Sequence, residues 1–198
     1  MKNSDMILAL LRDQGVIHLQ DVRAQGLSPS SLYWLHRTGR IVRVDRGRYA
    51  LPELPATEHH TLAEASRRAP KAVVCLLSAL RFHGLTTQAP FEVWLAIENK
   101  AWQPASTGLP LRFVRFSGDA FTTGVEMHGI EDAQVKVYSV AKTVADCFKY
   151  RHKIGLDVAI EALRDALHQR KATVDDLWQF AEICRVQAVI KPYIEAML

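Results

Sequence analysis

The fold of the N-terminal part is decided by residues 28–49, which read SPSSLYWLHRTGRIVRVDRGRY. Ser28 is a typical N-cap residue, Pro29 suits the first helical position, and Gly39 favours a helix end. We therefore expect a helix that begins after Ser28 and stops before Gly39. Residues that are typical of helix starts and helix ends thus stand at both boundaries of the expected helix.

The side of this helix that faces away from its core is unusual for a solvated surface. Leu32 and Leu35 mark the buried side. At about 100° per residue, the opposite direction carries four other side chains, namely Ser30, Tyr33, Trp34 and Arg37. Exposed tyrosine, tryptophan and arginine together predict a binding partner. The alternative that Tyr33 or Trp34 packs in the protein core stays open.

The helix is followed by a short basic hairpin. Residues 40–44 form a β-rich run, Asp45-Arg46-Gly47 supplies turn residues, and residues 48–51 return. Shorter amphipathic helices are expected at residues 4–15 and 19–25. Two helices, a capped third helix and a basic hairpin are the layout of a winged helix-turn-helix, in which the third helix enters the major groove of DNA.

The charge of the chain is concentrated in this segment. Residues 1–50 hold eight basic and four acidic side chains, so the whole formal charge of +4 lies there, while the remainder is neutral. Arginines neutralise phosphates with planar, forked donors, and phosphate contacts supply much of DNA affinity. The alternative is a solvated basic face or a surface for an acidic protein partner.

Composition limits the other possibilities. The chain has 198 residues, of which 48% are apolar and 23% are charged, as in an ordinary globular protein of one or two domains. No apolar run is long enough for a membrane span, and the first residues lack a secretory signal. Three widely spaced cysteines argue against a disulfide framework and favour the cytoplasm.

The rest of the chain predicts a second domain at residues 57–198, joined to the first (residues 1–52) by a proline-containing connector at 52–56. Helices are expected at 57–69, 72–82 and 139–150, in a stripe from Leu156 to Leu167 and after Thr173, and Pro192 is expected to break or start the last helix. Strands are expected at 91–97, 111–116, 125–128 and 134–138. The order of helices, strands and helices predicts an α+β domain with a small, mainly antiparallel sheet.

Catalytic motifs are weak. Glu98-Asn99-Lys100 at a strand end resembles part of a metal-dependent nuclease site, but such a site needs an aspartate on a preceding strand, and none occurs between Asp45 and Asp119. A polar turn is the favoured interpretation, with a nuclease using Glu98 and Lys100 as the alternative. No zinc spacing and no phosphate-binding glycine loop is found, so we expect no enzyme, metal or cofactor.

One charged pair lies on an otherwise apolar helix. Lys142 and Asp146 have i, i+4 spacing, and either an exposed ion pair or a semi-buried contact to the sheet or a partner is expected.

Three segments resemble a known family. Residues 35–49, 77–85 and 137–146 are similar to the corresponding parts of AbiEi-type antitoxins of type IV, abortive-infection toxin–antitoxin systems. The resemblance implies a repressor that binds inverted repeats in its own promoter, as monomer or dimer. It also implies a nucleotidyltransferase-like toxin that is countered without the need for a stable complex.

The DNA-binding residues expected from the helix, the hairpin and the resemblance are Ser28, Ser30, Tyr33, Trp34, Arg37, Arg40, Arg43, Arg46 and Arg48. The resemblance assigns DNA contacts to the five arginines. It assigns no residue to toxin neutralisation, and a solitary winged-helix regulator remains the alternative.

Overall fold

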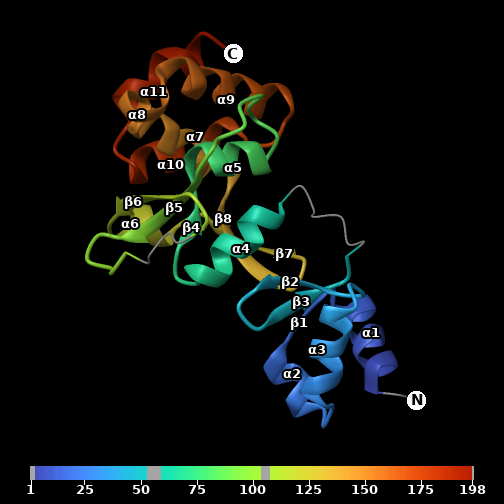
Figure 1. Ribbon diagram of the computed structural model, residues 1–198. Helices are drawn as coiled ribbons and strands as arrows, with labels where there is room; N and C mark the ends of the chain where they lie inside the picture. Colours follow the sequence, from blue (N-terminus) through green and yellow to red (C-terminus); the bar gives the residue numbers. More distant parts are fainter. Residues whose placement is uncertain (1–2, 53–58, 104–107, 198) are drawn as a thin grey trace. The chain divides into compact units, whose positions relative to one another are not determined.

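The structure is a computed structural model that describes residues 3–52, 59–103 and 108–197 (Figure 1). Most of the expected connector and the expected helix start at Thr57 lie outside these residues. The chain divides into two compact units. The N-terminal unit comprises Met1–His60 with Gly129–Ala133, and the C-terminal unit comprises Thr61–His128 with Gln134–Leu198.

The described part of the N-terminal unit contains three helices and a three-stranded sheet. Its elements are α1 (Asn3–Gln14), β1 (Val16–His18), α2 (Leu19–Ala24), α3 (Pro29–Arg37), β2 (Val42–Asp45) and β3 (Arg48–Ala50). The strands lie in the order β1-β3-β2 and both pairings are antiparallel. The three expected helices and the expected hairpin are present, and β1 is an addition that the sequence interpretation missed.

The core of this unit follows the helical spacing of its leucines. Leu32 and Leu35 of α3 are fully buried, and they pack with Leu11 of α1 and Val22 of α2. Tyr49 of β3 closes the cluster from the sheet side. Burial of one face of each helix leaves the opposite face of α3 available to solvent.

The C-terminal unit has a five-stranded sheet. Its strands are β4 (Val73–Val74), β5 (Val93–Glu98), β6 (Leu111–Phe116), β7 (Val125–Ile130) and β8 (Ala133–Tyr138), in the order β6-β5-β4-β8-β7. The pairs β5·β6 and β4·β8 are parallel, and the pair β4·β5 is antiparallel. The expectation of a mainly antiparallel sheet is therefore wrong, because the pairing is mixed.

The helices of this unit are α4 (His60–Arg68), α5 (Leu76–Phe82), α6 (Asp119–Thr122), α7 (Val140–Lys149), α8 (Arg151–Ile154), α9 (Leu156–His168), α10 (Val174–Ile183) and α11 (Gln187–Glu195). The expected helix at 72–82 is partly wrong, because Val73–Val74 form a strand and the helix begins at Leu76. Pro192 lies inside α11, so the expectation that it breaks or starts the last helix is wrong. The mixture of helix and sheet agrees with the α+β class.

Packing in the C-terminal unit centres on α7. Eight of its residues are buried, and it contacts α5, α9, α10 and α11 (Figure 1). The helix starts at Ser139, whose hydroxyl accepts a hydrogen bond from the Lys142 amide, as expected for an N-cap. Among the described residues, no helix is both long and apolar enough to cross a bilayer.

Candidate nucleic-acid interface

The exposed face of α3 carries the aromatic side chains singled out in the sequence. Tyr33 is 51% exposed and Trp34 is 45% exposed, whereas Leu32 and Leu35 are fully buried. Neither aromatic residue belongs to the core, contrary to the alternative that either one packs inside. Ser30 and Arg37 are also exposed, so the predicted face exists as a surface.

The two ends of α3 are fixed by local hydrogen bonds. Ser28 is the N-cap residue and is half-buried, but its hydroxyl does not cap the helix. Instead, its Oγ lies 2.5 Å from Oγ of Ser30. At the other end, the Thr38 hydroxyl donates to the carbonyl of Trp34 at 2.9 Å. The Ser28 contact therefore holds the Ser30 side chain, which reduces its rotational freedom before any partner binds.

The β2–β3 hairpin, which we call the wing, has a tight and bulged turn. Asp45 Oδ1 accepts a hydrogen bond of 2.7 Å from the Arg46 amide. Gly47 has φ +75°, a conformation that favours glycine. The register shifts between Arg43 and Asp45, which marks a bulge next to the tip. A bulge increases local twist and changes the direction of nearby side chains.

His18 connects the wing to the helices. Its backbone amide bonds to Asp21 Oδ2 at 2.8 Å and its Nδ1 accepts from the Gln20 amide at 3.1 Å, so it forms a capping box at the start of α2. The Leu19 amide donates to the Gly47 carbonyl at 2.8 Å. A side-chain Cβ at position 47 would lie 3.2 Å from His18 Nε2. The turn of the wing therefore packs closely against the His18 imidazole.

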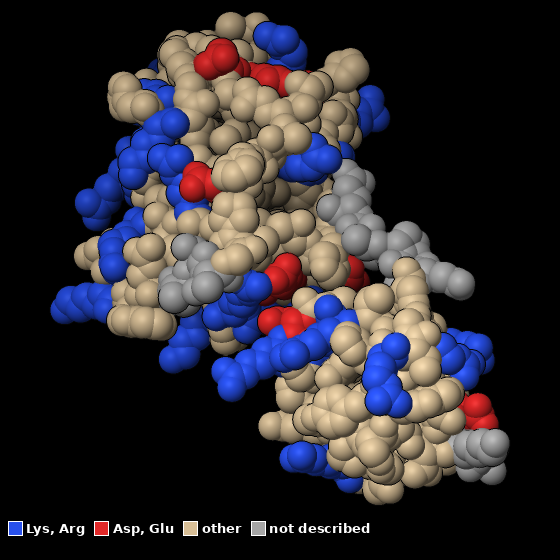
Figure 2. Space-filling model, in the orientation of Figure 1, with Lys and Arg blue, Asp and Glu red and all other residues tan. Residues whose placement is uncertain are grey.

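Four of the five candidate arginines are exposed: Arg37, Arg40, Arg43 and Arg46. Within the described part of the chain none of these four forms an ion pair, and the Arg43 Nε donates to the Asp45 carbonyl at 3.2 Å. Figure 2 shows exposed Lys and Arg side chains on the N-terminal unit. The guanidinium groups are therefore available for an anionic partner.

Arg48 differs from the other four. Its guanidinium forms an ion pair with Asp132, which lies in the turn between β7 and β8 that belongs to the N-terminal unit. The two side chains are 16% and 20% exposed. In the same turn, Glu131 accepts a hydrogen bond of 2.9 Å from His60 Nδ1. A phosphate must compete with a carboxylate for Arg48, so this arginine is the least available of the five.

Glu98 and Lys100, the residues of the nuclease alternative, lie in the C-terminal unit at the end of β5. Both are exposed, and both line a cavity next to Trp102. No group of three His, Cys, Asp or Glu residues that fits a metal ion occurs among the residues that the structure describes.

Lys142 and Asp146 form an ion pair that is fully buried. The sequence predicted either an exposed ion pair or a semi-buried contact, so the pair is more deeply buried than either interpretation. The Cys184 thiol donates to Asp146 Oδ1 at 3.2 Å, and the Lys142 ammonium lies 4.1 Å from the ring centroid of Tyr138. Burial raises the pKa of Asp146, while the neighbouring Lys142 opposes that rise. Burial also raises the pKa of Cys184 to about 12, so its thiol stays protonated.

The N-terminal unit thus defines a basic module with a half-exposed aromatic helix and an arginine-bearing wing, which is a class of surface that suits a polyanion. Residues 5–52 match the family model described as "Transcriptional regulator, AbiEi antitoxin". The resemblance to AbiEi antitoxins is confirmed for this segment. No curated protein matches the chain.

Proposed function

We propose that the chain is a winged-helix transcriptional repressor that binds double-stranded DNA through α3 and the wing. The observation that carries the proposal is the set of exposed arginines around an exposed aromatic helix face in one small unit. The match of this segment to antitoxin transcriptional regulators supports it. A helix of this size fits the major groove, where base edges are distinguishable.

The proposed contacts divide by position. Ser30, Tyr33, Trp34 and Arg37 on α3 meet base edges, while Arg43 and Arg46 on the wing contact the phosphate backbone. Ser28 acts by holding Ser30, since their hydroxyls are in contact. Arg40 lies between helix and wing and contributes a backbone contact. Backbone contacts position a protein and base contacts give sequence preference.

We further propose that the operator consists of inverted repeats in the protein's own promoter, bound by one or two protomers. The toxin partner is a nucleotidyltransferase-like protein, countered without a stable complex. These statements rest on the family resemblance. A nucleotidyltransferase reading frame next to this one would support the antitoxin role, whereas a lone gene would favour a solitary regulator.

The central experiment measures DNA affinity as a function of salt. With about four phosphate contacts from each of two protomers, a plot of log K against log salt should have a slope of about −7. A flat plot would falsify the electrostatic part of the proposal.

Replacing Arg46 or Arg37 singly by alanine distinguishes the proposed backbone contact from the proposed base contact. Arg46→Ala should weaken binding to all DNA sequences alike, because the wing tip is assigned to the backbone. Arg37→Ala should change the preference at individual base pairs by about 1–3 kcal/mol. Competition binding with single-base operator variants measures both. If Arg46→Ala altered the base preference and Arg37→Ala did not, the assigned roles would be reversed.

Removal of the acid that holds Arg48 should strengthen DNA binding. Asp132→Asn takes away the carboxylate beside the guanidinium and leaves a side chain of similar size, so Arg48 gains access to phosphate. We expect an affinity increase of severalfold at low salt that shrinks as salt rises. The control is Asp175→Asn in α10, which should leave the affinity unchanged. Equal affinity for Asp132→Asn and the unaltered protein would show that Arg48 makes no contact with DNA.

A further inference from the structure

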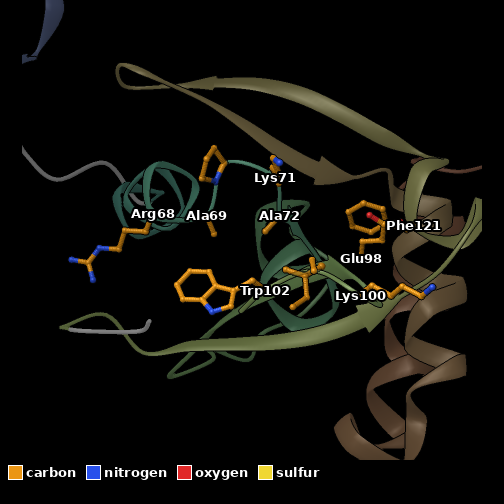
Figure 3. A pocket seen from close by; sticks show the side chains of 11 residues that line it. Arg68, Ala69, Lys71, Ala72, Glu98, Lys100, Trp102 and Phe121 are labelled. Carbon is orange, nitrogen blue, oxygen red and sulfur yellow. The ribbon is translucent and has the colours of Figure 1, made fainter. Parts of the chain in front are cut away.

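The C-terminal unit contains a cavity of about 730 Å³ that the DNA-binding proposal does not use. Its walls come from the end of α4 and the turn into β4, from the end of β5 and the residues after it, and from α6. Trp102 and Phe121 lie in different parts of the wall, with Ala72 between them in the view of Figure 3. Its volume falls in the range of small-molecule sites, about 300–1,000 Å³.

Trp102 is the unusual residue in this cavity. Although it lines the wall, its side chain is 80% exposed. An indole is one of the largest apolar groups in proteins and normally buries most of its surface against other atoms. The flat face of Trp102 is therefore a ready platform for a planar ring.

The backbone that carries Trp102 is held in place. The Ala101 amide donates to the Glu98 carbonyl at 2.9 Å. Arg115 of β6 donates from Nη1 to the carbonyl of Ala101 at 3.0 Å and to that of Asn99 at 2.5 Å. These bonds hold the backbone just before Trp102 against the neighbouring strand, so the sheet fixes the main chain that carries the indole.

Charged groups around the cavity favour an anion. Lys71 and Lys100 are exposed lining residues, and Arg68 lies at the margin with its guanidinium paired to Glu64. Figure 3 shows the Arg68 side chain pointing to one side of the cavity and the Lys100 side chain extending to the other. Lys71 and Lys100 are the two lysines among the described residues that line the cavity. Lysine ammonium groups on flexible stems are suited to phosphate as point charges.

Two further groups limit what the ligand can be. Among the described lining residues Glu98 is the one acid, and as an exposed carboxylate it accepts hydrogen bonds from a ligand that has N–H or O–H donors. The Pro70 carbonyl already accepts a hydrogen bond of 3.2 Å from Lys136 Nζ. A polar planar ring with donors, linked to an anionic group, satisfies all of these features.

We propose that this cavity binds a mononucleotide. The base stacks on Trp102, the phosphate lies near Lys71 and Lys100, and Glu98 accepts a hydrogen bond from an amino or ribose hydroxyl group. The site lies entirely in the C-terminal unit, so the proposal is independent of DNA binding by the N-terminal unit.

Calorimetric titration of the full chain with AMP, GMP, CMP and UMP tests the proposal, with inorganic phosphate and a single-stranded oligonucleotide as further probes. We expect saturable binding of at least one mononucleotide. Trp102→Ala should lower its affinity about 5- to 150-fold, the range for loss of one base–aromatic stack. Trp102→Phe should recover much of that loss. The matched control is Phe91→Ala, which removes an aromatic residue that is 87% exposed in the same unit and is not among the lining residues, and it should leave nucleotide affinity unchanged.

Exchange of the lysines tests the anionic part of the site. Lys71→Ala and Lys100→Ala should each weaken nucleotide binding severalfold and make it less sensitive to salt, while Lys191→Ala on α11 should not. Absence of binding by all four nucleotides overturns the proposal. It is also overturned if inorganic phosphate binds with the same affinity as the mononucleotide, or if the oligonucleotide binds at this site more tightly than the mononucleotide. An unchanged nucleotide affinity in Trp102→Ala would overturn it too.

Discussion

Lys142→Met should destabilise the protein by about 3–5 kcal/mol, the cost of leaving one member of a buried ion pair without its partner. Both side chains are fully buried on α7, where Lys142 also lies over the Tyr138 ring. Asp146 then keeps a carboxylate in an apolar core with the Cys184 thiol as its remaining described hydrogen-bond donor. Urea unfolding followed by circular dichroism measures the change.

The destabilisation should depend on pH. Burial already raises the pKa of Asp146, and loss of the lysine that opposes this rise moves the pKa of Asp146 further upward. A carboxyl whose pKa is higher in the folded state binds its proton more tightly when folded, so stability is lost as pH rises above the unfolded value of about 4. The decrease in the free energy of unfolding caused by Lys142→Met should therefore be largest at neutral pH and smallest under acid conditions.

A double variant and a surface pair provide the controls. Lys142→Met with Asp146→Leu removes both charges and should recover much of the lost stability, since apolar replacement of a whole buried pair is often neutral. Lys191 and Glu195 have the same spacing on α11, but each side chain is 60% exposed. Lys191→Met should change the free energy of unfolding by less than about 0.5 kcal/mol. Equal effects at the two sites would contradict the role assigned to burial.

Simultaneous exchange of Arg37, Arg40, Arg43 and Arg46 for alanine should reduce operator affinity by about a thousandfold or more and make the salt slope much shallower. All four side chains are exposed, so the fold of the N-terminal unit should be retained. Fluorescence anisotropy with labelled operator DNA measures the affinity, and thermal unfolding checks the fold.

Four exposed cations of the C-terminal unit give a control with the same change in net charge, namely Arg112, Lys153, Arg164 and Lys191. Their replacement by alanine should reduce affinity far less, because the general field is altered while the proposed contacts remain. If both quadruple variants lost the same affinity and the same salt slope, net charge rather than the α3 and wing surface would account for DNA binding.

The parts of the fold that local chemistry decides were predictable. Pro29 and Gly39 framed α3, and Ser139 and Thr173 marked the starts of α7 and α10. Errors arose where pairing with distant residues decides the structure. Val73–Val74 pair with Ala96, Leu95 and Val137, and a short apolar run does not reveal such partners. The mixed direction of the sheet follows from the same pairings.

The exposure of the aromatic residues on α3 was predictable, but the pairing that makes Arg48 less available was not. Helical spacing separated Tyr33 and Trp34 from the buried leucines, and their exposure is as expected. The Arg48–Asp132 pair joins residues 84 positions apart, which no local pattern indicates. The cavity beside Trp102 also brings together α4, β5 and α6, and the sequence around Glu98-Asn99-Lys100 does not indicate that these elements form one cavity wall.

The close packing of Gly47 against His18 has a consequence for the DNA sequence that the proposed repressor would bind. Because the Gly47 carbonyl accepts a hydrogen bond from the amide of Leu19, the first residue of α2, the turn of the wing is held against α2 before any partner binds. In the proposed DNA complex, the protein therefore sets the spacing between the DNA contacted by α3 and the DNA contacted by the wing. Base substitutions beneath the wing should be tolerated, whereas insertion of a single base pair between the footprints should not.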